Sequence, residues 1–102
     1  MLKETPFLEV LKQIGKHKIT LIEVGSDSCH SCQKMGKILY KIKQKHPEYP
    51  IYFVNVRKER EVAYRLKVQM IPTQIVVNSK GYEIYRHIGV LLEKEIERIF
   101  EK

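Results

Sequence analysis

The sequence predicts an α/β fold in which a mixed four-stranded sheet carries helices on both faces. Two observations lead to this prediction. Short runs rich in β-branched residues alternate with segments whose apolar residues recur at helical spacing, and the last two runs are separated only by a tight turn. The resulting order is α-β-α-β-α-β-β-α. Strands joined through a helix are parallel and a tight hairpin is antiparallel, so the sheet is expected to be mixed.

The chain of 102 residues is expected to form one domain, residues 1–102. No run approaches the roughly 20 apolar residues that span a bilayer, and residues 1–6 lack the apolar core of a secretion signal. We therefore expect a cytoplasmic protein without a membrane partner, although a chain that had lost a signal peptide would look the same. Two cysteines in one motif do not form a structural disulfide framework.

The net charge of +7 favours acidic partners. Four lysines recur at helical spacing and are expected to form a solvated helix face: Lys34, Lys37, Lys41 and Lys45. No stacking-aromatic motif or DNA-binding pattern accompanies these lysines, so nucleic acid is not an expected partner. We expect a monomer.

The first helix is predicted to begin at Thr5 and Pro6, with Thr5 as the N-cap and Pro6 in the first turn, and to end at Gly15. Its buried stripe is expected to be Phe7, Leu8, Leu11 and Ile14. The predicted strands are 18–24, 51–56, 73–77 and 82–87, with a hairpin turn at 78–81.

Three further helices are predicted, over 29–46, over 57–68 and after Gly89, and Pro47 ends the first of them. The expected buried face of helix 29–46 is Cys32, Met35, Ile38, Leu39, Ile42 and His46. Helix 57–68 is expected to bury Val62, Ala63 and Leu66, with Tyr64 as a further candidate. In the last helix the expected stripe is Leu92, Ile96, Ile99 and Phe100.

The motif Cys29-His30-Ser31-Cys32 stands between an apolar strand and a helix, which is typical of a dithiol redox centre. At a helix start the free N–H groups and the helix dipole stabilise a thiolate at the first cysteine. The second cysteine, in the first turn, is placed to attack a mixed disulfide. A zinc site is disfavoured because zinc normally takes four ligands, and only these two cysteines and His30 are nearby. We predict no metal and no cofactor.

With this motif the chain resembles the thioredoxin superfamily over nearly its whole length. Ile71-Pro72-Thr73 is similar to the cis-proline loop of that family, and Gly81 and Gly89 fall where the family has glycines. The resemblance implies a thioredoxin-like fold that lacks the usual first strand. It also implies a cis bond before Pro72, and a substrate-binding surface that includes Ile71, Pro72, His30 and Gly89.

Glu23 lies six residues before Cys29 in an apolar strand, where the family has a buried acid. Burial would raise the pKa of this carboxyl group and suit it to accept the proton of Cys32. Simple alternation along the strand would instead turn Glu23 to solvent, but a central strand should be covered on both faces.

The sequence departs from the family in having Ser28 where an aromatic residue usually precedes the first cysteine, and His30-Ser31 between the cysteines. A cation at His30 would favour the reduced pair and make the disulfide more oxidising; otherwise His30 is an exposed loop residue. The remaining histidines are expected to be solvated or partly packed: His17, His46 and His87.

Two functions are consistent with these features. The first is a thiol–disulfide oxidoreductase that reduces or exchanges protein disulfides, with Cys29, Cys32 and Glu23 as catalytic residues and a separate reductase or redox partner that recycles the pair. The alternative is a redox-inactive binding module with the same fold.

Overall fold

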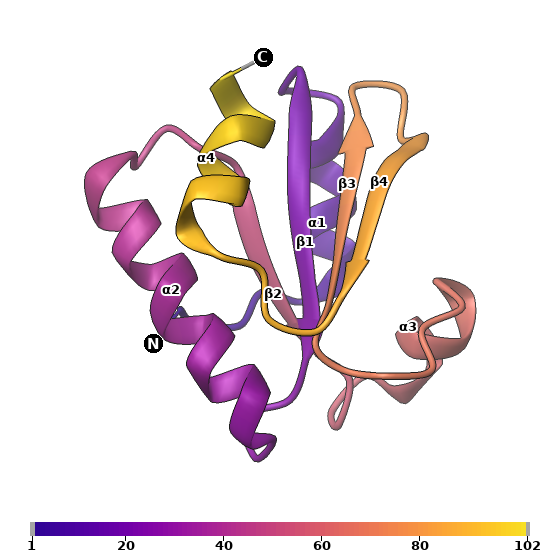
Figure 1. Cartoon of the computed structure of the whole chain (residues 1–102). Helices are drawn as coiled ribbons and strands as arrows, with labels where there is room; N and C mark the ends of the chain where they lie inside the picture. The colour runs from indigo at the N-terminus through magenta and orange to yellow at the C-terminus, as the bar shows by residue number, and fades with distance from the viewer. Residues whose placement is uncertain (1, 102) are drawn as a thin grey trace.

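The computed structural model describes residues 2–101, and its elements follow the predicted order (Figure 1). The helices are α1 (Phe7–Ile14), α2 (His30–Lys45), α3 (Arg60–Arg65) and α4 (Glu93–Glu101). The strands are β1 (Ile19–Gly25), β2 (Ile51–Asn55), β3 (Thr73–Asn78) and β4 (Glu83–Ile88). The predicted α/β class and mixed sheet are confirmed.

The sheet has the strand order β2-β1-β3-β4, so β1 and β3 are the two inner strands. β1 runs parallel to β2 and antiparallel to β3, and β3 pairs with β4 as a hairpin. One row of neighbours crosses all four strands at Phe53, Glu23, Gln74 and His87. This row lies near the end of β1 from which the chain enters α2.

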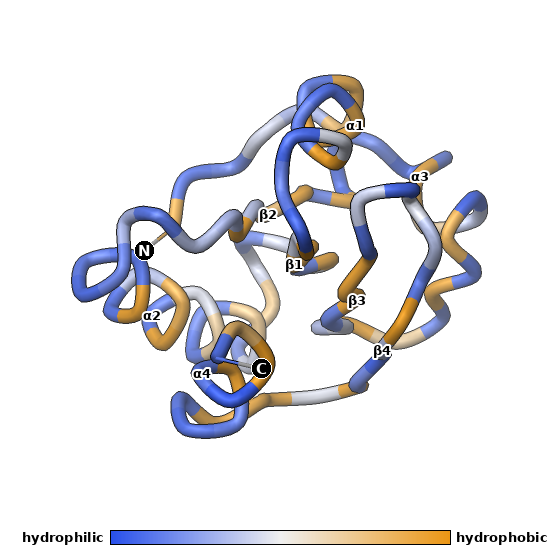
Figure 2. The backbone as a smooth tube through the Cα atoms, turned by 90° about the horizontal axis from the view of Figure 1, so that it is seen from above, coloured by the Kyte–Doolittle hydropathy of each residue, from blue (hydrophilic) through white to orange (hydrophobic). Residues whose placement is uncertain are grey.

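Helices cover both faces of the sheet, with α1 and α3 on one side and α2 and α4 on the other (Figure 2). The first face is filled from α1 and α3 by Phe7, Val10, Ile14 and Val62. The second is filled from α2 and α4 by Met35, Leu39, Ile42 and Ile96. The inner strands are therefore covered on both sides, which explains their nearly continuous apolar sequences.

The segment before α1 makes only a trace of a fifth strand. Glu4 forms an isolated parallel bridge with Phe53, and the Thr5 N–H donates to the Phe53 carbonyl at 2.7 Å. Among residues 2–101 the sheet thus has four strands, and the expected lack of a full first strand is confirmed.

The predicted start of α1 is wrong in its capping. Pro6 occupies the N-cap position, and no side chain of the segment itself caps the helix. The carboxylate of Glu59, just before α3, instead accepts from the Phe7 N–H, with both oxygens at 3.2 Å. A residue 52 positions away provides this cap, so local sequence could not reveal it.

Replacing Glu59 by alanine should lower the free energy of unfolding by about 1 kcal/mol, because the first turn of α1 loses its acceptor. Denaturant unfolding measures this change. Glu61→Ala, on an exposed neighbouring acid, is the matched control and should have a smaller effect. Equal effects of the two variants would contradict the cap.

Two predicted buried stripes need correction. In α1, Leu8 is 69% exposed and Leu11 is also exposed, while Val10 is fully buried. In the last helix, Leu92 is 65% exposed and the preceding Leu91 is buried in its place. A helix on the surface of a protein buries only the stripe that faces the core, so neighbours of the stripe remain in solvent.

α3 is shorter than predicted. The side-chain oxygen of Asn55 accepts a hydrogen bond from the Arg57 N–H. The Asn55 carbonyl accepts from the N–H groups of Lys58 and Glu59. These bonds hold a turn where helix was expected, and Lys67, with φ of 56°, follows the end of the helix. Tyr64 is 84% exposed, so it is not a core residue.

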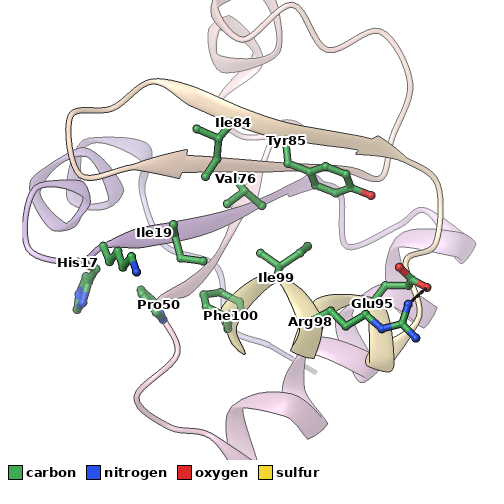
Figure 3. Close-up of a pocket in the computed structure, with 11 residues that line it drawn as sticks. His17, Ile19, Pro50, Val76, Ile84, Tyr85, Glu95, Arg98, Ile99 and Phe100 are labelled. Carbon is green, nitrogen blue, oxygen red and sulfur yellow. Dashed lines mark ion pairs between the residues drawn. The ribbon is translucent and has the colours of Figure 1, made fainter. Parts of the chain in front are cut away.

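A groove of about 820 Å³ opens between α4 and the sheet, where Ile84 and Tyr85 of β4 face Ile99 (Figure 3). His17, before β1, and Pro50, before β2, also line it. These residues lie at the end of the sheet away from the cysteines, so the groove is separate from the dithiol. Among residues 2–101, no helix combines the length and hydropathy needed to cross a bilayer.

Candidate active site

The two cysteines lie at the N-terminus of α2, directly after a short loop from β1. Cys29 is the N-cap residue, and α2 begins at His30, one residue later than predicted. The Cys29 Sγ accepts from the Cys32 N–H at 3.3 Å and lies 3.4 Å from the Ser31 Oγ. A sulfur in this position meets the unpaired N–H groups of the first turn, and these favour its negative form.

The two thiols differ in exposure and acidity. Cys29 is partly exposed and Cys32 is buried. Partial burial alone would raise the pKa of Cys29, but hydrogen bonds from Cys32 and Ser31 outweigh it and hold the pKa below its usual value. Burial, together with the hydrogen bond to Cys29, raises the pKa of Cys32 to about 12. One sulfur is therefore suited to attack a disulfide, and the other needs a base before it can react.

Glu23 is 1% exposed, so the predicted burial of this carboxyl group is confirmed. One oxygen, Oε1, accepts from the Gln74 Nε2 at 2.9 Å. Within residues 2–101 the other oxygen, Oε2, has no hydrogen-bond partner. Burial, with a smaller contribution from the charge on Cys29, raises the pKa of Glu23 to about 8 against the lowering effect of the Gln74 bond. Glu23 can thus gain or lose a proton near neutral pH.

Gly25 lies between Glu23 and Cys32 in space, and the sequence analysis assigned it no role at the site. A Cβ atom here would lie 3.1 Å from the Cys32 Sγ and 3.7 Å from the Glu23 Oε2. The Cys32 sulfur and the unpartnered Glu23 oxygen therefore both border the position that a side chain at residue 25 would occupy. A larger residue here would crowd the thiol.

The loop before β3 meets the same end of the sheet. Thr73 pairs with Val24 at the end of β1, and the Ile71–Pro72 bond is cis. The Gly89 N–H donates to the Pro72 carbonyl at 2.8 Å, and Gly89 has a φ of 96° that favours glycine. Ile71, Pro72 and Gly89 therefore lie together, and their part in substrate binding stays a prediction.

His30 is exposed, in the first turn of α2. Ser28, also exposed, precedes the cysteines in place of the family's aromatic residue. Among residues 2–101 no three His, Cys, Asp or Glu side chains are grouped so that they could hold a metal ion. The chemistry that the site offers is that of two thiols beside a carboxyl group.

The structure adds two residues that sequence reasoning missed. Gln74 is fully buried beside Glu23, and its Oε1 lies 2.8 Å from the His87 Nδ1. The sequence signal that could have identified Gln74 is its position as a polar residue in an otherwise apolar strand, two residues after Pro72. His87, expected as one of several unassigned histidines, in fact belongs to this hydrogen-bonded row.

Alkylation by iodoacetamide at pH 6 should modify Cys29 at least about tenfold faster than Cys32, because the rate follows the fraction and exposure of thiolate. Peptide mass spectrometry of the reduced protein measures the two sites. Denatured protein is the control, in which the two rates should become similar. Equal labelling in the native state, or faster labelling of Cys32, would contradict the assigned roles.

Comparison with known proteins places the chain in a family. A family model described as a thioredoxin-like domain matches residues 8–102, and the chain belongs to this family. A protein of Brevibacillus choshinensis named "Disulfide bond formation protein" is 30% identical over 84 residues, which cover 80% of this chain and 70% of the relative.

Solved thioredoxins have the same fold. A mutant thioredoxin from Halobacterium salinarum superposes with a TM-score of 0.84 at 16% identity, covering 98% of this chain and 87% of its own. The oxidised mitochondrial thioredoxin 3 from Saccharomyces cerevisiae has a TM-score of 0.77 at 22% identity, covering 99% and 93%. The thioredoxin-like fold is therefore shown, and the family with its paired cysteines supports an oxidoreductase role in general terms.

Proposed function

We propose that this protein catalyses thiol–disulfide exchange on protein substrates, with Cys29 as the attacking thiol and Cys32 as the resolving thiol. The observation that carries the proposal is the asymmetry of the pair. Cys29 is partly exposed with a lowered pKa, whereas Cys32 is buried with a raised pKa beside a buried carboxyl group. Two cysteines that only pack in the core are not expected to differ in exposure and pKa in this way.

In the first step the Cys29 thiolate attacks a substrate disulfide. One substrate sulfur leaves as a thiolate, and the other stays joined to Cys29 in a mixed disulfide. This step removes the negative charge of Cys29, which in the reduced protein raises the pKa of both Glu23 and Cys32. Loss of that charge makes Cys32 easier to deprotonate and Glu23 easier to ionise.

In the second step Cys32 gives its proton to the Glu23 carboxylate, and its sulfur attacks the Cys29 sulfur. The Cys29–Cys32 disulfide forms, the second substrate thiolate leaves, and Glu23 later releases the proton to solvent. The substrate disulfide gains two electrons and the cysteine pair loses them. The reverse sequence transfers a disulfide to a dithiol substrate, which is the direction that the name of the Brevibacillus choshinensis relative suggests.

The partners that fit this proposal are protein disulfides on acidic surfaces, together with a cytoplasmic redox partner that recycles the pair. Lys34 and Lys37 are exposed on α2, five and eight residues after Cys29, and would attract acidic substrates. As the family resemblance implies, Ile71 and Pro72 present backbone to a substrate chain in extended conformation.

The test is catalysed reduction of a model protein disulfide, such as insulin, by dithiothreitol. The protein should accelerate the reaction, and both Cys29→Ser and Cys32→Ser should return the rate to background. Ser31→Ala is the matched control in the same loop and should keep most of the activity. No acceleration by the intact protein, with stoichiometric zinc found by metal analysis, would favour the binding module.

A further inference from the structure

A chain of hydrogen bonds crosses the sheet from the buried carboxyl group to the edge strand. Gln74 on β3 donates its Nε2 hydrogen to the Glu23 Oε1 at 2.9 Å, and its own Oε1 lies 2.8 Å from the His87 Nδ1 on β4. Backbone register places the three residues side by side on neighbouring strands. Glu23 and Gln74 are buried and His87 is partly buried, so His87 is the outer end of the chain.

The chemistry of an amide gives this chain a direction. An amide oxygen can only accept a hydrogen bond, so the His87 Nδ1 must carry the hydrogen in this contact. The Gln74 amide then presents its N–H to Glu23, and an N–H donor favours a carboxylate over a carboxylic acid. If the amide turned over, its oxygen would face Glu23 and would require a protonated carboxyl group instead.

No side chain on the other side of Glu23 replaces the Gln74 hydrogen bond. Its neighbour on β2 is Phe53, which has no polar side-chain atom, and the Oε2 has no partner among residues 2–101. The orientation of one amide therefore decides whether Glu23 meets a donor that favours its carboxylate form, and His87 holds that orientation.

Charged groups on the elements around this row are mostly engaged elsewhere. The titratable group that acts on Glu23 is Cys29, and the charge of Glu23 in turn raises the pKa of Cys32. Beside His87 on β4, the Arg86 guanidinium bonds Glu83 and the carbonyls of Leu66 and Lys67. On α2 and α4 the ion pairs are Lys41 and Lys45 with Glu93, His46 with Glu97, and Arg98 with Glu95.

We propose that His87 is a positioning residue for the resolving step: it orients the Gln74 amide so that its N–H stabilises the Glu23 carboxylate, which accepts the Cys32 proton. This proposal rests on the proposed function and adds a residue outside the cysteine motif to it. His87 touches neither thiol in this account. It acts only through Gln74.

The test separates the two sulfur steps in a stopped-flow reaction of reduced protein with 5,5′-dithiobis(2-nitrobenzoate). Attack by Cys29 releases a first coloured thiolate, and attack by Cys32 on the mixed disulfide releases a second. His87→Leu should slow the second phase about fivefold at pH 7 and move its pH midpoint upward by about one unit, since a lost hydrogen bond to a charged group changes its ionisation by that order. The first phase should change by less than about twofold.

His87→Asn is the rescue variant, because its side-chain amide can place an N–H near the position of Nδ1. It should restore the second phase to within about twofold of the original rate. His17→Leu, at the opposite end of the sheet, is the matched control and should leave both phases unchanged. Circular dichroism melting checks that each variant is folded.

The outcomes distinguish the two proposals. If the intact protein shows a second phase and His87→Leu changes neither its rate nor its pH midpoint, the role of His87 is overturned. The proposal of thiol–disulfide exchange then still stands. Slowing by His87→Leu that His87→Asn does not relieve would also overturn it, because the effect would then come from packing. A second phase missing from the intact protein would contradict the proposed function itself.

Discussion

Replacing Cys32 by serine is expected to convert the protein into one that captures its substrates and does not release them. Cys29 keeps its position at the start of α2 and can still attack a disulfide, but no sulfur remains to resolve the product. Turnover should fall by about two orders of magnitude or more, since residues that act as one unit fail together. Mixed disulfides should accumulate in cell extract and be recovered with their partners by non-reducing electrophoresis and mass spectrometry.

The control is Cys29→Ser, whose remaining thiol is buried and should capture nothing. The lysines near the motif add a second expectation: captured partners should be rich in acidic residues near the reactive cysteine, and capture should weaken at high salt. A Lys34→Gln, Lys37→Gln variant on the Cys32→Ser background should lose this salt dependence. Capture that does not change with salt concentration would contradict the electrostatic attraction of acidic partners. If the Cys32→Ser variant captures no protein while its Cys29 is intact and reduced, the proposed thiol–disulfide exchange is wrong.

Replacing Glu23 by glutamine is expected to slow the resolving step while leaving the first attack nearly unchanged. Glutamine keeps an oxygen for the Gln74 N–H but cannot take the proton of Cys32. General acid–base catalysis contributes about 10²-fold or more, so a loss of this order is expected in the second step. Rapid mixing with a disulfide reagent, followed by quenching in acid and intact mass measurement, counts the mixed disulfide directly.

The same substitution should change how stability depends on pH. Burial raises the pKa of Glu23 from 4.5 to about 8, so the folded protein binds a proton that the unfolded chain has released between these values. The unfolded state then binds fewer protons, and the free energy of unfolding falls as pH rises from about 4.5 to 8. Glu23→Gln removes this decrease, and by this linkage it should be more stable than the original protein by about 4 kcal/mol at pH 8 and by about 1 kcal/mol at pH 5.

Urea unfolding of both proteins in the presence of reductant measures the difference at the two pH values. Glu61→Gln, an exposed acid on α3, is the matched control and should follow the original protein. If Glu23→Gln and the original protein had parallel pH profiles, Glu23 would not titrate in this range and could not act as the proton acceptor.

The fold was predictable because its signals are local. Strands such as 18–24 and 51–56 are short runs of β-branched residues, and turn residues such as those at 78–81 mark the hairpin. Helix boundaries and buried stripes were predicted less well. The cap of α1 comes from Glu59 across the fold, and Asn55 takes N–H groups that would otherwise begin α3. The Glu59 cap leaves no trace in the sequence beside α1, whereas the Asn55 turn is local and of a kind that asparagine favours.

The residues of the candidate site likewise fall into those that local sequence predicts and those that it does not. The cysteine pair and Pro72 lie in short motifs, and Glu23 was found through its fixed distance from Cys29. The contributions of Gly25 and Gln74 could not be predicted, because they depend on which atoms meet across strands and on the space that a missing side chain leaves. His87 lies 64 residues after Glu23 in the sequence and is two strands away in the sheet.

The central claim is that Cys29 and Cys32 are a reversible dithiol–disulfide pair, and equilibration in graded redox buffers tests it most directly. The protein is incubated in dithiothreitol buffers of stated potential and quenched with acid and an alkylating reagent. Its intact mass is then measured by mass spectrometry. We predict one two-electron transition, in which tenfold changes in the ratio of forms are spaced by about 30 mV, between a doubly alkylated dithiol and an unalkylated intramolecular disulfide. Thiols that stay free across the whole range, or that oxidise only between molecules, would contradict the account.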